Sequence, residues 1–168
     1  DFDKQNAGAN AELAANIDLE NKEWAPVNNY KGNFNGKGHS ILNLNISKVS
    51  DYTGLFGSVN EGSVSDITVY GDITVKNSAS HIGGVVGYIN LGSVKNVVSY
   101  VNLNNDKYGS QVTHAGGIIG SVGNDKTDIE LRLCKKMSFN KILKIKCGIS
   151  DFHRKGKSVF ILEFDNMQ

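Results

Sequence analysis

Cysteine and arginine are almost absent from this 168-residue sequence. Its two cysteines are Cys134 and Cys147, and no arginine occurs before Arg132. The first 133 residues therefore contain no disulfide, which is consistent with an exported protein that does not use such bonds. No apolar run approaches the roughly 18 residues that a membrane-spanning helix needs, so we expect no membrane span.

The composition changes near residue 126. Residues 1–125 carry a net charge of −4 and 17 of the 19 glycines, whereas residues 126–168 carry a net charge of +5 and both methionines. The near-neutral total therefore combines two unlike parts. The sequence begins at Asp1 without a basic and apolar leader, so we expect any export signal to lie outside it.

Pairs of glycines recur in the segments TGLFGSV, GGVVGYI and GGIIGSV, first 30 and then 33 residues apart. The glycines in this frame are Gly54, Gly57, Gly84, Gly87, Gly117 and Gly120. Self-similarity at a period of about 20 to 50 residues indicates a stacked repeat architecture.

A second repeated frame places Asn or Asp between two apolar residues, as Asp66 lies between Val64 and Ile67. Apolar residues three apart face opposite sides of a flat strand, so a bend between them is needed to turn both inward. Asn and Asp tolerate the left-handed conformation of such a bend. The frame therefore predicts a structural ladder of Asn43, Asp66, Asn96 and Asp128.

Short alternating runs such as Ile67–Val69 and Ile73–Val75 predict strands, and no amphipathic stretch is long enough for a crossover helix. One repeat of this size cannot bury an apolar face alone, whereas stacked turns bury it continuously. We therefore predict an all-β solenoid of about four to five turns, in which equivalent residues of turns about 4.8 Å apart form columns.

The segments TGLFGSVNEGSVSDITVYG and IGGVVGYINLGSVKNVVSY resemble GLUG repeats, which are named for a Gly-Leu-x-Gly signature. These repeats occur in large bacterial surface and secreted proteins, among them the non-catalytic regions of immunoglobulin A-cleaving metallopeptidases. The resemblance covers about residues 13–131, including the upstream segments AANIDLENKEWAPV and YKGNFNGKGHSILNLNI. It implies a right-handed parallel β-helix, exported by a bacterium as part of a longer chain, and it implies no activity.

The repeat pattern stops after residue 133. Two accounts of residues 134–168 stay open. One is an atypical C-terminal cap, with strands at Phe139–Cys147 and Ser158–Phe164 that cover the open end of the solenoid. The other is a foreign, partly disordered segment. We therefore divide the chain into a GLUG-like solenoid, residues 1–133, and a basic tail, residues 134–168.

One polar position precedes each glycine pair by three residues and is held by Asp51, His81 and His114. Stacked turns would place them in a column, and one carboxylate with two imidazoles is a weak candidate for a zinc site. The alternative is an exposed loop of variable polar residues. Since the sequence offers no obvious fourth ligand, we expect neither a metal nor another cofactor.

Tyr70 and Tyr100 each lie seven residues after the serine of the second frame. Strand parity turns both outward, where adjacent rings could stack against a sugar or a protein surface. The alternative is an external aromatic ladder that only stabilises the fold. If a surface patch binds a host glycan or protein, these two residues are the first candidates.

No catalytic motif is found, and the basic tail has no recognisable nucleic-acid-binding module, so we expect neither catalysis nor a nucleic-acid partner. The predicted function is that of a non-catalytic extracellular repeat domain of a bacterial cell-surface or secreted protein, acting as a rigid spacer or an adhesin-like binding surface. The alternative is a carbohydrate-active β-helix enzyme, a polysaccharide lyase or hydrolase, which would carry carboxylates along one strand face.

Overall fold

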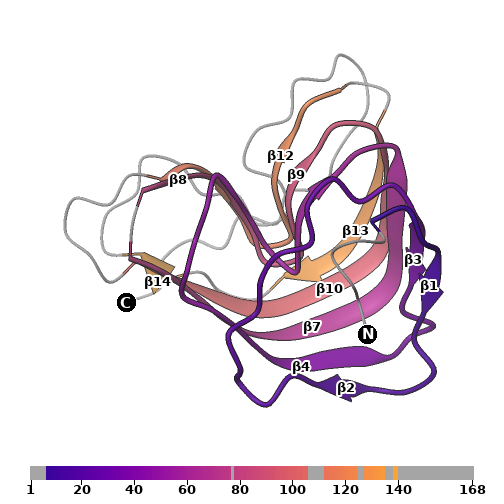
Figure 1. Ribbon diagram of the computed structural model, residues 1–168, viewed down its shortest axis with the longest axis horizontal. Coiled ribbons are helices and arrows are strands. Elements are labelled where there is room, and N and C mark those ends of the chain that lie inside the picture. Colours follow the sequence, from indigo (N-terminus) through magenta and orange to yellow (C-terminus); the bar gives the residue numbers. More distant parts are fainter. Residues whose placement is uncertain (1–6, 77, 106–111, 125–126, 135–137, 140–168) are drawn as a thin grey trace.

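The computed structural model describes residues 7–76, 78–105, 112–124, 127–134 and 138–139, and these residues form strands and the turns between them (Figure 1). No described residue is helical, and hence no helix in this part of the chain is long and apolar enough to cross a membrane. The strands are β1 (Ala11–Glu12), β2 (Ile17–Asp18), β3 (Asn33–Asn35), β4 (Ser40–Ile46), β5 (Tyr52–Thr53), β6 (Phe56–Val59), β7 (Gly62–Val75), β8 (Ala79–Gly83), β9 (Val86–Ile89), β10 (Gly92–Asn105), β11 (Val112–Gly116), β12 (Ile119–Val122), β13 (Asp128–Cys134) and β14 (Ser138–Phe139).

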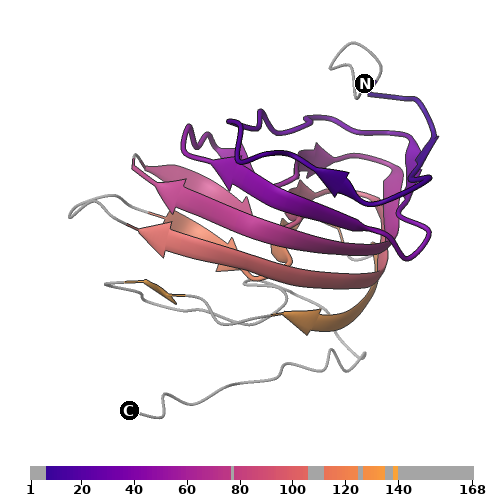
Figure 2. The same cartoon turned by 90° about the horizontal axis from the view of Figure 1, so that it is seen from below.

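Every strand pairing among the described residues is parallel. One sheet consists of β5, β8 and β11, a second of β6, β9 and β12, and the largest contains the remaining strands. Each of β8, β9 and β10 therefore pairs with the equivalent strand of the preceding repeat. Figure 2 shows the repeats as layers, whose colours run in sequence order from indigo to orange. The prediction of an all-β fold with parallel sheets is confirmed.

The longest pairing joins β7 and β10, which stay in register from Gly62 opposite Gly92 to the end of both strands. Each strand bends at one polar residue, since φ is 53° at Asp66 and 52° at Asn96. The bend turns the flanking apolar side chains inward, where they are buried. The Asn96 side-chain amide donates to Oδ1 of Asp66 across the two strands.

The core lies between the sheets and consists of columns of equivalent apolar side chains. Val64 lies opposite Val94 and Ile73 lies opposite Leu103, and all four are fully buried. Burial of one aliphatic side chain of this kind stabilises the fold by about 1.5–3 kcal/mol. These columns fix which residues point inward, and the residues that alternate with them therefore face outward.

The segment between Ile82 and Val86 contains one residue more than the equivalent segment between Thr53 and Phe56. Thr53 lies opposite Ile82, 29 positions later, whereas Phe56 lies opposite Val86, 30 positions later. Gly83, Gly84 and Val85 lie between Ile82 and Val86, whereas only Gly54 and Leu55 lie between Thr53 and Phe56. Residues of β8 before Gly83 therefore pair with residues of β5 that lie one position later than the 30-residue spacing of the glycines predicts.

Asn43 does not lie beside Asp66, and its place in the predicted ladder is wrong. Between Ile41 and Leu44 of β4 there are two residues, against one in the facing segment of β7, so Asn43 lies in a β-bulge with φ of 57°. The neighbour of Asp66 in the preceding repeat is instead the turn at Gly38, whose N–H donates to the Asp66 carbonyl at 2.8 Å.

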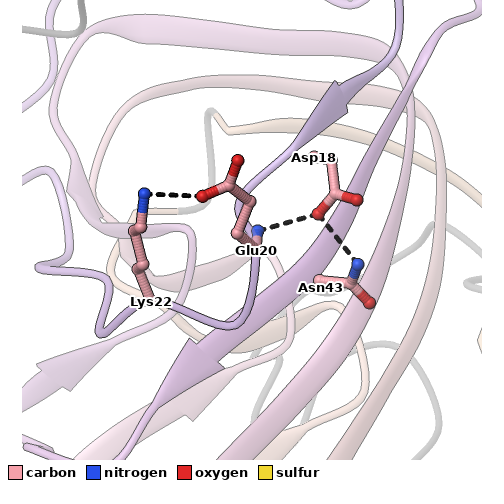
Figure 3. Close-up of polar contacts among 4 residues, drawn as sticks. All are labelled: Asp18, Glu20, Lys22 and Asn43. Atoms are coloured by element: carbon pink, nitrogen blue, oxygen red, sulfur yellow. Dashed lines mark hydrogen bonds and ion pairs between the residues drawn. The ribbon is translucent and has the colours of Figure 1, made fainter.

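The Asn43 side chain bonds to Asp18, at the end of β2 (Figure 3). Its Nδ2 donates to Oδ1 of Asp18 at 2.8 Å, and the backbone N–H of Glu20 donates to the same oxygen at 2.7 Å. The hydrogen bond from Glu20 and that from Asn43 lower the pKa of the Asp18 carboxyl. Lys22 forms an exposed ion pair with Glu20, so the four residues close this first turn.

Asp128 also lies away from the predicted ladder. It begins β13 opposite Ser93, three residues before Asn96. Its Oδ2 forms an ion pair with Nζ of Lys95 at 2.5 Å. The ladder thus consists of Asp66 and Asn96 within the part of the chain that the structure describes.

One residue of the predicted tail strands lies within the described residues. Phe139 belongs to β14, which pairs with the end of β10. The rest of Phe139–Cys147 and all of Ser158–Phe164 lie outside the described residues.

Candidate binding surface

Tyr70 and Tyr100 lie opposite each other on β7 and β10. Their ring centroids are 4.8 Å apart and their planes differ by 12°, so the two rings stack. Tyr70 is 40% exposed, because Val69 points into the core and the next residue must turn outward. Beside the rings, Nδ2 of Asn102 donates to Oδ1 of Asp72 at 3.0 Å. The two tyrosines thus form a partly exposed aromatic pair next to a carboxylate.

The predicted column of Asp51, His81 and His114 is only partly present. His114 lies opposite His81, but the residue opposite His81 on the other side is Tyr52. The single additional residue between Ile82 and Val86 causes this shift, so the place of Asp51 in the column is wrong. The Asp51 carboxylate instead accepts a hydrogen bond from Oγ of Ser80 at 3.1 Å.

The geometry of the two histidines does not favour a shared metal ion. Their ring centroids are 4.7 Å apart and their planes differ by 12°. The nitrogen lone pairs of an imidazole lie in the ring plane, so those of two stacked rings run side by side and do not converge on one ion. The described residues contain no cluster of three or more His, Cys, Asp or Glu side chains that could hold a metal.

His81 also forms a hydrogen bond with a serine of the following repeat. Oγ of Ser121 lies 2.6 Å from Nδ1 of His81. Burial lowers the pKa of the His81 imidazole, and the neighbouring His114 lowers it further, while Asp51 acts in the opposite direction. A serine bonded to a neutral histidine is the first requirement of a nucleophile. Ser121 is 95% buried, however, so a substrate carbonyl has no access to its hydroxyl and the contact is structural.

Two further tyrosines join His81 in one aromatic cluster. The ring of Tyr52 stacks on His81 at 5.3 Å and on Tyr88 at 5.2 Å. His81 and Tyr88 are themselves 5.5 Å apart. Tyr52 comes from β5, His81 from β8 and Tyr88 from β9, so the cluster joins two of the three sheets.

A groove of about 230 Å³ lies beside this cluster. Its lining residues are Asn29, Tyr52, Ser58, Val59, Asn60, Tyr88 and Asn90. The three asparagines form a column of side-chain amides, in which Nδ2 of Asn60 donates to Asn29 at 3.4 Å and Nδ2 of Asn90 donates to Asn60 at 3.2 Å. One wall of the groove is therefore aromatic and the other is made of amides.

The sequence alone did not lead to this groove. One signal was present, because Asn60 and Asn90 each lie three residues after a repeated glycine, Gly57 or Gly87. The tyrosines gave no such signal. Tyr52 precedes Gly54 and Tyr88 follows Gly87. This spacing does not indicate that the two rings are in contact.

Comparison with known proteins does not assign this surface. No family model, no curated protein and no solved structure matches the chain. The candidate binding surface therefore depends on its own geometry: the Tyr70–Tyr100 pair, the aromatic cluster and the groove beside it.

Proposed function

We propose that this chain is a non-catalytic repeat domain of a bacterial cell-surface or secreted protein, which holds a binding surface on a rigid scaffold. The scaffold would be a right-handed parallel β-helix of about four to five turns, the architecture that GLUG-like repeats imply. It would act as a spacer or an adhesin-like surface within a longer extracellular chain. The repeated segments that resemble GLUG repeats support this assignment.

The observation that carries the proposal is the continuous register of β7 and β10, from Gly62 opposite Gly92 to Val75 opposite Asn105. A pairing of this length ties two neighbouring repeats together by parallel backbone hydrogen bonds along a whole face. Because the columns beneath it are fully buried, one repeat cannot bend away from the next without exposing core side chains. Such a unit resists bending and suits the display of surface residues.

The exposed Tyr70–Tyr100 pair supports the adhesive part of the proposal. Partly exposed aromatic rings offer an apolar surface with a polar hydroxyl group, of the type that protein partners use. Their regular placement on neighbouring repeats would hold a ligand in one orientation.

The carboxylates near this surface have structural contacts. Asp66 accepts from Asn96 and Asp72 accepts from Asn102, each from the following repeat. A glycosidase of the usual kind needs two carboxyl groups on either side of the bond that it cleaves. These hydrogen bonds favour a structural role for the two carboxylates, in a ladder that holds repeats together, and do not favour a catalytic acid–base pair.

Two measurements test the proposal. The purified chain, incubated with a panel of bacterial and host polysaccharides, is expected to release no new reducing ends and no unsaturated sugars; reproducible release of either would establish an enzyme instead. Hydrogen exchange is expected to be slowest in β7 and β10, as a rigid scaffold requires. Rapid exchange throughout both strands in the folded chain would contradict a rigid scaffold.

A further inference from the structure

We propose that the groove between Tyr52 and the asparagine column binds a single ring of a neutral sugar. This inference rests on the proposed function, because it names the ligand class of an extracellular binding surface. It places this sugar ring in the groove, which is a site separate from the Tyr70–Tyr100 pair.

The aromatic wall of the groove ends in an open ring face. In its sheet, β5 is the edge strand of the order β11, β8, β5, so Tyr52 is the last ring of its column within the described residues. One face of the ring covers His81 and Tyr88, and the side chain remains 37% exposed. The weakly polarised C–H groups on one face of a pyranose can pack against such a ring.

The second tyrosine of this wall, Tyr88, packs between two neighbours. Its hydroxyl oxygen lies against Gly123, 2.0 Å from the position that a Cβ atom would take there. Tyr52 covers the same ring from the other repeat at 5.2 Å. Because the aromatic wall is held before any ligand arrives, little conformational entropy is lost on binding.

The opposite wall offers hydrogen bonds that match sugar hydroxyl groups. Each side-chain amide has two N–H groups and an oxygen with two lone pairs, and the Asn29–Asn60–Asn90 column uses one N–H and one lone pair for each internal link. The amide of Asn60, bonded on both sides, keeps one N–H and one lone pair for another partner. A hydroxyl group both donates and accepts, so it can use both.

Charge and size define the ligand class. None of the seven lining residues carries a carboxylate, an amine or a guanidinium, so the groove offers no ion-pairing partner to a uronic or sialic acid. Its volume of about 230 Å³ lies below the range of about 300–1,000 Å³ that drug-sized ligands occupy. One neutral hexose ring of a longer glycan fits these limits better than a charged or extended ligand.

The test is a titration of the ¹⁵N-labelled chain with methyl glucoside, methyl galactoside and methyl mannoside, observed by NMR. At least one of these probes is expected to shift the Asn60 and Asn90 side-chain amide signals. Tyr52→Ala should weaken that binding by about tenfold, because it removes one aromatic face. Ile17→Ala, at an exposed apolar residue of β2 outside the groove, is the control and should leave the affinity unchanged, while Tyr70→Ala separates the groove from the Tyr70–Tyr100 pair. Asn60→Asp, of nearly the same shape, should also weaken binding, and it tests the amide wall should Tyr52→Ala fail to fold.

Several results would overturn the inference. One is the absence of any shift at millimolar concentrations of all three probes. Another is a stronger response to methyl glucuronide than to methyl glucoside, which would exclude a neutral ligand class. If Tyr70→Ala abolished binding while Tyr52→Ala did not, the groove would be the wrong site, and the proposed adhesive function would stand. A failure of the rigid scaffold appears instead in the hydrogen exchange of β7 and β10, so the two failures are distinguishable.

Discussion

A Cβ atom on Gly120 would lie 2.4 Å from the carbonyl oxygen of Gly87 in the repeat before it. Gly87 has the same relation to Gly57, at 2.6 Å. Real Cβ atoms do not approach a backbone oxygen so closely, and the oxygen cannot move without disturbing its own strand. The glycines recur because each one lies against the backbone of its counterpart in the neighbouring repeat.

Gly87→Ala is therefore expected to destabilise the fold. The added methyl group would meet the Gly57 carbonyl and backbone atoms of Thr53, and such overpacking costs about 1–3 kcal/mol. Urea unfolding followed by circular dichroism measures the difference. Gly8→Ala is the control, since no atom lies within 4 Å of its Cβ position, and it should change stability by less than about 0.5 kcal/mol. Equal stability of both variants would contradict the close approach between repeats.

Asn96 should be sensitive to substitution for two separable reasons. Its φ of 52° is unfavourable for alanine by about 1–2 kcal/mol but not for glycine. Both substitutions also remove the hydrogen bond to Asp66. Asn96→Ala should therefore lower the free energy of unfolding more than Asn96→Gly, by about 1 kcal/mol.

The control for this comparison is Asn102→Ala. It removes a similar hydrogen bond, to Asp72, at a residue without positive φ, and should cost about 1 kcal/mol. Chemical denaturation of the three variants gives the values. A glycine variant less stable than the alanine variant would show that the bend does not need the left-handed conformation.

The stability of the chain should depend on pH through His81. Burial and the neighbouring His114 lower its pKa in the folded state, so the unfolded chain binds a proton more readily. The contribution of the neutral imidazole is therefore complete above the ordinary histidine pKa of about 6.5. It is lost as the pH falls below this value towards the lowered pKa. Unfolding midpoints measured in urea between neutral and mildly acidic pH test this expectation.

Two variants show whether His81 is the responsible group. His81→Phe keeps an aromatic ring but cannot titrate, so the stability of this variant should depend less on pH across the same interval. Asp51→Asn removes the charge that raises the His81 pKa and should steepen the dependence. The same steepness in all three proteins would assign the effect to another group.

Tyr70 and Tyr100 should stabilise each other even when no ligand is present. Their rings stack at 4.8 Å, and such a pair contributes about 0.5–1.5 kcal/mol beyond the area that it buries. A double-mutant cycle of Tyr70→Ala, Tyr100→Ala and the combined variant isolates this coupling. A coupling energy near zero would mean that the rings only lie near each other, which would leave ligand binding as the reason for their exposure.

Much of the scaffold could be predicted from spacing alone. Copies about 30 residues apart indicate that like positions pair, and so Tyr70 lies opposite Tyr100 and Asp66 beside Asn96. The same reasoning misplaced Asn43, because β4 contains a bulge. A bulge adds one residue without changing the hydrophobic pattern on either side of it, so the sequence does not reveal it.

The candidate groove was less accessible to prediction. Tyr52 and Tyr88 belong to different sheets, and their contact depends on the angle of the corner between β5 and β6 and of its counterpart in the next repeat. The segment between Ile82 and Val86 also contains the additional residue that moves Asp51 out of the histidine column and puts Tyr52 in its place.

The sequence by itself determined that strands repeat at intervals near 30 residues, that apolar positions fill a common interior and that glycine is required where one backbone meets the next. These properties depend on composition and period. The tertiary structure decided the one-residue offsets at corners and bulges, and through them which polar and aromatic side chains became neighbours. Side chains alternate between the two faces of a strand, so a shift of one residue exchanges the outward and inward positions, and the packing of the whole core decides which shift is taken.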